Sequence, residues 1–245
     1  LVQVIYGEEF VNKFIFDVDG TLTPSRQPID KDFEKFFYDF CLGNEVYLVT
    51  GSDKPKTVEQ IGEKIYNRCR RVYQCNGNDV WKGEENIRTN EWTLPDLART
   101  FLKNCQYESP FSIRTGNHIE ERPGMVNFSI VGRNANIEER AKYVAYDTFE
   151  NERNTVASSF NTLFPDLSAK VGGETGIDIS PKGADKSQIV KDFNKQDTLW
   201  FFGDAIYEGG NDYPLAKVVK NHRKVTGWAQ TKEYLEVFQD NGKAV

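Results

Sequence analysis

Histidine and cysteine are scarce in this sequence, and their scarcity narrows the chemistry that the protein can perform. The 245 residues include two histidines and four cysteines. Neither His118 nor His222 has a nucleophile or an acidic partner beside it in a motif, so histidine-based catalysis has few candidates. No two cysteines form a Cys-x-x-Cys pair, so we expect reduced packing residues. These are Cys41, Cys69, Cys75 and Cys105.

The sequence also lacks an excess of positive charge and any long apolar run. Its 37 acidic residues outnumber its 31 lysines and arginines, which gives a net charge of −6 at pH 7. This balance argues against a nucleic-acid surface but leaves room for a basic pocket that binds an anionic small molecule. No apolar stretch approaches a membrane span, and residues 1–9 lack the basic region of a signal peptide. We therefore expect a cytoplasmic protein with neither a nucleic-acid nor a membrane partner.

Two aspartates at the end of an apolar run are the first strong signal of function. The run Phe14-Ile15-Phe16 is typical of a buried strand, and Asp17 and Asp19 follow it. In extended backbone both side chains point the same way, and their charges repel unless a cation or a shared proton intervenes. Magnesium is the ordinary partner of such oxygen ligands. The alternative, an Asp-Gly turn closing a hairpin, lacks a complementary strand after Thr21.

Two further strand ends carry polar groups in the same way. Residues 46–49 predict a buried strand that ends in Thr50-Gly51-Ser52. Residues 198–202 predict another, which ends in Gly203-Asp204 and leads into a glycine-rich acidic loop up to Asp212. The order strand, turn and helix occurs twice in succession, which is the signature of a parallel sheet. The carboxyl ends of these strands would meet at one edge of that sheet.

The middle third of the chain breaks this pattern and predicts a separate α+β unit. Val126 and Phe128 alternate with polar residues, as in an antiparallel strand with one solvated face. We predict an α/β fold: a Rossmann-like core with a doubly wound parallel sheet, formed by residues 1–81 and 184–245, and an inserted cap with an antiparallel sheet, formed by residues 82–183. Outside residues 126–130, the expected helical or extended segments of the cap are residues 94–102, 111–114, 137–146, 152–164, 167–171 and 177–179.

Carboxylates, hydroxyls and glycine-exposed amides at one sheet edge suit a phosphoryl group bound together with magnesium. A carboxylate nucleophile can accept the phosphoryl group as an aspartyl-phosphate. A second carboxylate two residues further on can give a proton to the leaving oxygen and later take it back. A lysine would complete the charge balance, and Lys186 is the best placed by its order in the chain.

The order of these motifs resembles that of the haloacid dehalogenase superfamily. The motifs are Asp17-Val18-Asp19-Gly20-Thr21, Thr50-Gly51-Ser52, Lys186, and Gly203-Asp204 with Gly209-Gly210-Asn211-Asp212. The resemblance implies that Asp17 is the nucleophile and Asp19 the acid/base, and that Ser52 and Lys186 complete the catalytic set. It also implies a magnesium site, whose ligands would be Asp17, Asp19, Asp204 and Asp212.

The middle unit resembles the cap of eukaryotic-type phosphomannomutases. The likeness lies in residues 122–133 and in Glu138-Glu139-Arg140, and the core adds residues 16–24, Arg26-Gln27 and residues 201–204. The resemblance implies interconversion of mannose 6-phosphate and mannose 1-phosphate, often with glucose phosphates as well. The reaction would pass through an aspartyl-phosphate enzyme and a hexose 1,6-bisphosphate, which also serves as activator. The resemblance further implies a homodimer formed through the cap.

By the same resemblance, arginines hold the phosphate that is not reacting and polar residues contact the sugar. A guanidinium suits that task because it binds phosphate oxygens in two directions and keeps its charge. A surface salt bridge is the alternative for a cap arginine beside Glu138 and Glu139. The expected substrate-binding residues are Arg26, Arg122, Asn127, Arg133, Arg140 and Asp178.

Several positions depart from the family pattern. Gly176 stands where the family usually has serine, so a substrate hydrogen bond is missing or comes from Thr175. Thr50 replaces a glycine, and residues 213–218 lack the acidic and threonine residues that hold a second cation in the family. The rival activity is a sugar-phosphate phosphatase, in which water accepts the phosphoryl group. A non-enzymatic sugar-phosphate-binding module would require the loss of a core motif, and all core motifs are present.

Overall fold

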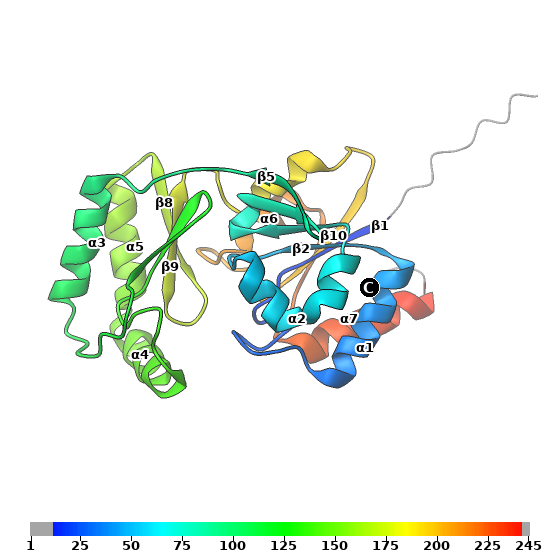
Figure 1. The fold of residues 1–245 in the computed structure, drawn as a ribbon, viewed down its shortest axis with the longest axis horizontal. Helices are drawn as coiled ribbons and strands as arrows, with labels where there is room; N and C mark the ends of the chain where they lie inside the picture. Colours follow the sequence, from blue (N-terminus) through cyan, green and yellow to red (C-terminus); the bar gives the residue numbers. More distant parts are fainter. Residues whose placement is uncertain (1–11, 242–245) are drawn as a thin grey trace, which may run out of the picture.

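The computed structural model describes residues 12–241, which form two units of different architecture (Figure 1). Residues 1–11 and 242–245 lie outside the described residues, and so do the outer ends of the predicted core ranges and the segment compared with a signal peptide. The larger unit is an α/β core around a seven-stranded sheet, and the smaller is an α+β cap around a four-stranded sheet. The predicted fold class is confirmed.

The core sheet is parallel at its centre. Its strands are β1 (Asn12–Phe16), β2 (Glu45–Val49), β3 (Arg71–Gln74), β4 (Asp79–Lys82), β5 (Glu85–Thr89), β10 (Thr198–Gly203) and β11 (Asn221–Lys224). They lie in the order β11-β10-β1-β2-β3-β4-β5. β1 pairs in parallel with both β10 and β2, whereas β4 and β5 form an antiparallel hairpin at one edge. β1 is therefore a central strand, and its carboxyl end lies among those of its neighbours.

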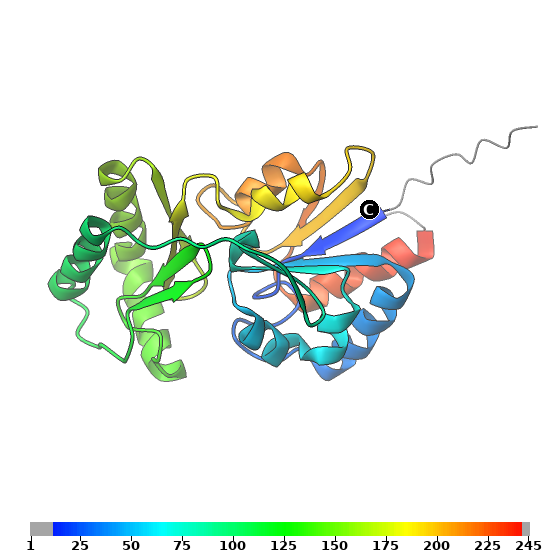
Figure 2. The same cartoon turned by 45° about the horizontal axis from the view of Figure 1, so that its top comes forward.

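Helices cover both faces of the core sheet, as Figure 2 shows. Phe14 and Phe16 pack toward one face and Ile15 toward the other, so β1 is buried on both sides. The first face is covered by α1 (Lys31–Gly43), α2 (Lys54–Arg68) and α7 (Trp228–Asn241). The second is covered by the 3₁₀ helix η2 (Lys186–Asp192) and by α6 (Tyr213–Val218). A short 3₁₀ turn, η1 (Cys75–Gly77), follows β3.

The cap is an antiparallel sheet with helices on one face. Its strands β6 (Ile119–Arg122), β7 (Met125–Phe128), β8 (Leu167–Gly172) and β9 (Gly176–Pro181) lie in the order β6-β7-β9-β8. Phe128 and Ile177 of the sheet pack with Tyr143 and Phe160 of the helices. The helices are α3 (Asp96–Glu108), α4 (Ile137–Glu150) and α5 (Glu152–Leu163). They lie on the outer side, and the other face of the sheet is turned toward the core (Figure 1).

Some segments differ from the sequence-based expectations. β5 belongs to the core sheet, although it lies beyond residue 81, where the predicted core segment ends. Its sequence, Glu-Asn-Ile-Arg-Thr, is mostly exposed at the sheet edge, so no apolar pattern announces a strand. Residues 111–114, predicted to be extended, form no strand, and the Arg114 guanidinium donates to the carbonyls of Gln106 and Ser109 at the end of α3. β6 and α6 were not expected. No helix among the described residues is long and apolar enough to cross a membrane.

Candidate active site

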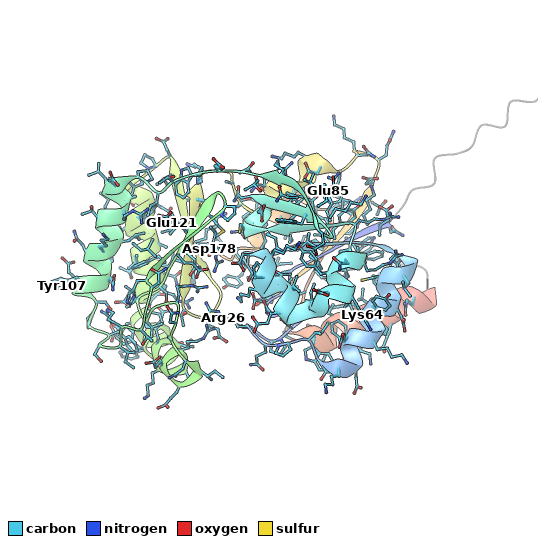
Figure 3. All side chains as sticks on the ribbon, in the orientation of Figure 1. Arg26, Lys64, Glu85, Tyr107, Glu121 and Asp178 are labelled. Carbon is cyan, nitrogen blue, oxygen red and sulfur yellow. The ribbon has the colours of Figure 1, made fainter. Side chains whose placement is uncertain are left out.

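A polar cavity of about 240 Å³ lies where the carboxyl ends of the core strands face the cap sheet. Arg26 and Asp178 lie on the facing sides of core and cap (Figure 3). The core wall includes Asp17, Asp19, Ser52, Lys56 and Asp204. The cap wall includes Arg122, Asn127, Arg133, Glu174 and Asp178. Three of the predicted site residues do not line this cavity: Lys186, Asp212 and Arg140. Lys186 contacts the lining residue Asp17 and also Asp212, and Arg140 contacts the lining residue Glu174.

Two buried carboxylates and one half-buried carboxylate gather at the ends of β1 and β10. Asp17 follows β1 and Asp204 follows β10; because the two strands pair in parallel, the Asp17 N–H donates to the Phe202 carbonyl at 2.9 Å. Asp212, at the start of α6, completes the group, and one oxygen from each carboxylate lies within 4.8 Å of the others. The Lys186 ammonium donates to Asp17 Oδ1 at 2.6 Å and to Asp212 Oδ1 at 2.7 Å. Four residues that are far apart in the sequence thus meet in one cluster.

The charges in this cluster do not balance. Burial raises the pKa of Asp17 well above its ordinary value, and the negative charges of Asp212 and Asp204 add to that, although Lys186 opposes it. Burial and Asp212 likewise raise the pKa of Asp204 to about 6. The pKa of Lys186 is raised despite its burial, because Asp17 and Asp212 hold its proton. One ammonium faces three carboxylates, so the group has the oxygen donors and the surplus negative charge that fit a divalent cation such as Mg²⁺.

Asp19 lies apart from that cluster and faces α2. Its carboxylate accepts hydrogen bonds from the Arg26 backbone N–H at 2.7 Å and from Gln60 Nε2 at 3.0 Å. The Lys56 ammonium is 3.7 Å from its second oxygen. Burial tends to raise the pKa of Asp19, but Lys56 and these donors outweigh it and lower that pKa below its ordinary value. The two aspartates of the motif therefore stand in different electrostatic surroundings.

The turn after Asp19 requires a glycine. Gly20 has a φ of +80°, and a Cβ atom there would lie 2.5 Å from the Asp204 carboxylate. Both the left-handed backbone and the close approach exclude a side chain. Gly20 thus lets the chain turn away from β1 and leaves room for the Asp204 carboxylate beside the turn.

Sequence reasoning missed two residues of α2 that contact Asp19. Lys56 and Gln60 are four residues apart, so they lie on one face of the helix. The Lys56 ammonium also donates to Ser52 Oγ at 3.2 Å, and Ser52 Oγ lies 3.4 Å from Asp19. Burial lowers the pKa of Lys56 to about 8, in spite of Asp19. The four-residue spacing of Lys56 and Gln60, shortly after the Thr50-Gly51-Ser52 turn, was the only signal of these residues in the sequence. No residue pattern within α2 indicates that this helix faces Asp19.

The cap arginines are paired with acids on the cap itself. Glu120 accepts from Arg122 Nε at 2.8 Å and from Arg133 Nε at 2.5 Å. Burial tends to raise the pKa of Glu120, yet the two guanidiniums lower it to about 2. Arg122 also donates to the Gly51 carbonyl of the core at 2.5 Å. A hydrogen bond between cap and core thus comes from one of the predicted phosphate-binding residues.

Arg26 and Arg140 complete the predicted set of arginines. Burial, together with the positive charges of Arg133 and Arg140, lowers the pKa of Arg26 to about 10. The structure therefore brings the arginines close enough to repel one another across the cavity. Arg140 itself pairs with Glu174 through Nε at 3.1 Å and through Nη2. Mutual repulsion in a buried place favours the binding of an anion such as phosphate.

Asn127 and Asp178 lie side by side on the cap face that is turned toward the core. They are partners in the pairing of β7 with β9, and Asn127 Nδ2 donates to Asp178 Oδ1 at 2.6 Å. Asn127 Oδ1 is buried and has no hydrogen-bond partner among the described residues. A Cβ atom on Gly176 would lie 2.7 Å from the Asn127 amide, so Asn127 fills the space that a larger residue would take. The unpaired oxygen is ready to accept a hydrogen bond from a hydroxyl group.

The remaining titratable residues singled out in the sequence lie outside the cavity lining. His118 Nδ1 lies 2.9 Å from the Ser129 carbonyl, and His222 Nδ1 lies 3.0 Å from the Val219 carbonyl. All four cysteines are free thiols. Burial raises the pKa of Cys75 to about 12, which keeps its thiol protonated.

This fold and this order of motifs define a class of protein, the haloacid dehalogenase superfamily. The core carries the aspartate pair after β1, the serine after β2, the lysine on η2 and the aspartates after β10, and a cap covers them. Among solved structures, the chain resembles a sugar phosphatase of subclass IIB of that superfamily. The TM-score is 0.57 at 16% sequence identity, and the match covers 91% of this chain and 91% of that one.

The sequence comparisons narrow the class to one family. The family model of the eukaryotic phosphomannomutases matches residues 33–239. A phosphomannomutase of Spinacia oleracea is 34% identical over 213 residues, which cover 82% of this chain and 84% of that protein. A phosphomannomutase of Encephalitozoon cuniculi is 33% identical over 225 residues, covering 87% and 86%. The chain belongs to the eukaryotic phosphomannomutase family, a family of intramolecular phosphotransferases, and the predicted resemblance is confirmed.

Proposed function

We propose that the protein interconverts mannose 6-phosphate and mannose 1-phosphate, with glucose phosphates as further substrates. One observation carries the proposal: carboxylates, a serine and a lysine line the core wall of a single cavity, and two arginines line its cap wall. The first set would transfer the phosphoryl group, and the second would bind another phosphate. A hexose bisphosphate needs two such anion-binding ends, one for the reacting phosphate and one for the other. A phosphatase for hexose monophosphates needs the first end alone.

In the proposed reaction, a hydroxyl of the hexose monophosphate attacks the phosphorus of an aspartyl-phosphate at Asp17, and the bond between phosphorus and the Asp17 oxygen breaks, which gives the hexose 1,6-bisphosphate. The ionised Asp19 takes the proton of that hydroxyl and later gives it to the leaving sugar oxygen in the second transfer. Ser52 Oγ and Lys186 Nζ hold phosphoryl oxygens and offset their charge. The sugar turns between the two transfers, so that the hexose 1,6-bisphosphate presents its other phosphate to Asp17. The freed Asp17 carboxylate then attacks that phosphorus, and the bond between phosphorus and the sugar oxygen breaks.

Magnesium is the metal that we propose for the carboxylate cluster. It would be held by Asp17, Asp204 and Asp212, with Asp19 as the fourth predicted ligand. When bound, Mg²⁺ would offset the negative charge between these carboxylates and a phosphoryl group. The Asp19 side chain is not part of the cluster, so its share in binding the metal stays a prediction.

In the proposed complex, the arginines bind one end of the sugar phosphate, and the polar pair of Asn127 and Asp178 contacts its sugar. We propose that Arg26, Arg122, Arg133 and Arg140 hold the phosphate that is not reacting. Asn127 Oδ1, which is buried and unpaired among the described residues, would accept a hydrogen bond from a sugar hydroxyl, and Asp178 would accept another. We also propose a cytoplasmic homodimer formed through the cap.

A product assay tests this function against the phosphatase alternative. Mannose 1-phosphate with a trace of hexose 1,6-bisphosphate and Mg²⁺ should yield mannose 6-phosphate, and glucose 1-phosphate is assayed in parallel. Release of inorganic phosphate alone would reject the mutase and favour the phosphatase.

The Asp17→Asn variant is expected to lose turnover, because its amide cannot accept the phosphoryl group. Asp166→Asn, at an exposed position of the cap, is the matched control and should keep full activity. Activity in the Asp17→Asn variant would reject Asp17 as the nucleophile.

A further inference from the structure

Glu174 is one of two acidic cap residues, with Asp178, in the wall of a cavity to which the cap also contributes Arg122 and Arg133. It lies in the turn between β8 and β9, and it lines the cavity while its partner Arg140 does not. Its carboxylate accepts from Arg140 Nε at 3.1 Å and from Arg140 Nη2. The Glu174 side chain is 44% exposed, whereas that of Arg140 is 9% exposed. The carboxylate therefore stands on the cavity side of this ion pair.

The turn that carries Glu174 is fixed to the cap helices. Arg153 Nη1 donates to the Gly173 carbonyl at 2.9 Å. Arg153 is itself held by Asp147, whose oxygens accept from its backbone N–H and from its Nε, each at 2.7 Å. Asp147 and Arg153 belong to α4 and α5. Arg153 Nη1 also donates to the Gly176 carbonyl at 3.5 Å, so the turn is held on both sides of Glu174. The position of Glu174 against Arg140 is thus set by the fold and not by a loose surface loop.

The acids of the cap already occupy most of the predicted phosphate-binding arginines. Glu120 bridges Arg122 and Arg133, and Glu174 takes Arg140. A phosphate that binds to Arg140 must therefore share the guanidinium with a carboxylate or displace it. Two anions on one guanidinium repel each other, and the repulsion is strong in a partly buried place.

We propose that Glu174 competes with the distal phosphate of the substrate for Arg140 and so limits how tightly the cap binds that phosphate. This inference rests on the proposed function and names a residue that determines substrate affinity. A mutase benefits from such a limit, because the bisphosphate has to leave the cap arginines in order to turn. An ion pair that only positioned Arg140 for phosphate would act in the opposite direction, since its loss would weaken binding.

The test is a calorimetric titration in the Asp17→Asn background, which suppresses turnover. The variant is Glu174→Gln, which removes the charge and keeps the shape. The matched control is Glu138→Gln, an exposed residue of α4 that pairs with Lys142, so both variants change the net charge equally. The probes are mannose 6-phosphate and inorganic sulfate, the second of which needs no sugar contact.

Glu174→Gln is expected to lower the Kd of both probes about fivefold relative to the control variant, as for the loss of a partly exposed charge. Equal Kd values in the two variants, or a higher Kd in Glu174→Gln, would overturn the proposal. Tighter sulfate binding with no binding of mannose 6-phosphate would uphold the competition at Arg140 and reject the sugar phosphate as substrate. Failure of the proposed competition at Arg140 and failure of the proposed function therefore give different results.

Discussion

At the residue scale, the surroundings of Asp17 and Asp19 differ in a way that supports the different roles proposed for them. Asp17 lies among other carboxylates, and its own pKa is raised. Asp19 lies among hydrogen-bond donors, and its own pKa is lowered. The first is thereby placed next to a site for a cation, and the second is held ionised beside an ammonium. Lys56 is the residue that contributes most to the second setting, because its charge faces both Asp19 and Ser52.

Lys56 gives a prediction at this scale. Lys56→Met should lower kcat about tenfold or more. The substitution removes a positive charge that lies beside Asp19, the proposed acid/base, and beside the Ser52 hydroxyl, which would hold the phosphoryl group. Lys56→Arg should recover part of the loss. Steady-state measurement of kcat and KM separates an effect on the reaction from one on binding.

Lys54→Met is the matched control for that experiment. Lys54 pairs with Glu84 at 2.8 Å and lies 4.1 Å from the centre of the Trp81 ring, outside the cavity lining. The same kinetic constants in the Lys54 and Lys56 variants would show that Lys56 has no special part in the reaction.

At the scale of elements, the strand ends and the turns after them decide where the functional groups lie. β1 and β10 run in parallel, and that pairing alone places Asp17 against Asp204. In the cap, Arg133 follows a tight turn at Gly132, whose φ is +97°. A Cβ atom on Gly132 would lie 2.0 Å from the Thr115 carbonyl oxygen, which is backbone and cannot move aside easily.

Gly132→Ala is therefore expected to lower the free energy of unfolding by about 2–4 kcal/mol, because a left-handed backbone and a backbone clash combine there. Urea unfolding followed by circular dichroism measures the change. Gly43→Ala is the control, since nothing lies within 4 Å of its Cβ position, and it should be neutral or about 0.5 kcal/mol more stable. Equal midpoints for the two variants would contradict the clash.

At the scale of the whole molecule, the site belongs to neither unit alone. The core supplies the aspartates after β1 and β10 together with Lys56 and Arg26, and the cap supplies Arg122, Arg133 and the polar pair of Asn127 and Asp178. The contact between Arg122 and the Gly51 carbonyl joins the two units at the edge of the cavity. A ligand with a phosphate at each end would bind to both units at once and favour their approach.

We expect the molecule to become more compact when ligand binds. Small-angle scattering should give a smaller radius of gyration with hexose 1,6-bisphosphate and Mg²⁺ than without them, because the ligand draws cap and core together and excludes water. The Arg122→Ala variant should show a weaker change. Identical dimensions with and without the ligand would leave closure unsupported.

The sequence by itself determined the core architecture and its chemical motifs. A buried central strand requires an apolar run, and its carboxyl end requires the polar residues that follow, so Phe14-Ile15-Phe16 and Asp17 are readable locally. The order of the motifs up to Asp204 and Asp212 then indicated phosphoryl transfer. These features depend on residue type and short spacing, which a single chain displays directly.

Only the tertiary structure decided which distant groups meet. Lys56 faces Asp19 because α2 packs beside the turn after β1. Glu174 faces Arg140 of α4 because Arg153 of α5 holds the β8–β9 turn. β5 joins the core sheet because the sheet edge offers it hydrogen bonds, although its own residues are polar. Each of these contacts depends on the packing of segments far apart in the chain, and no local pattern carries that information.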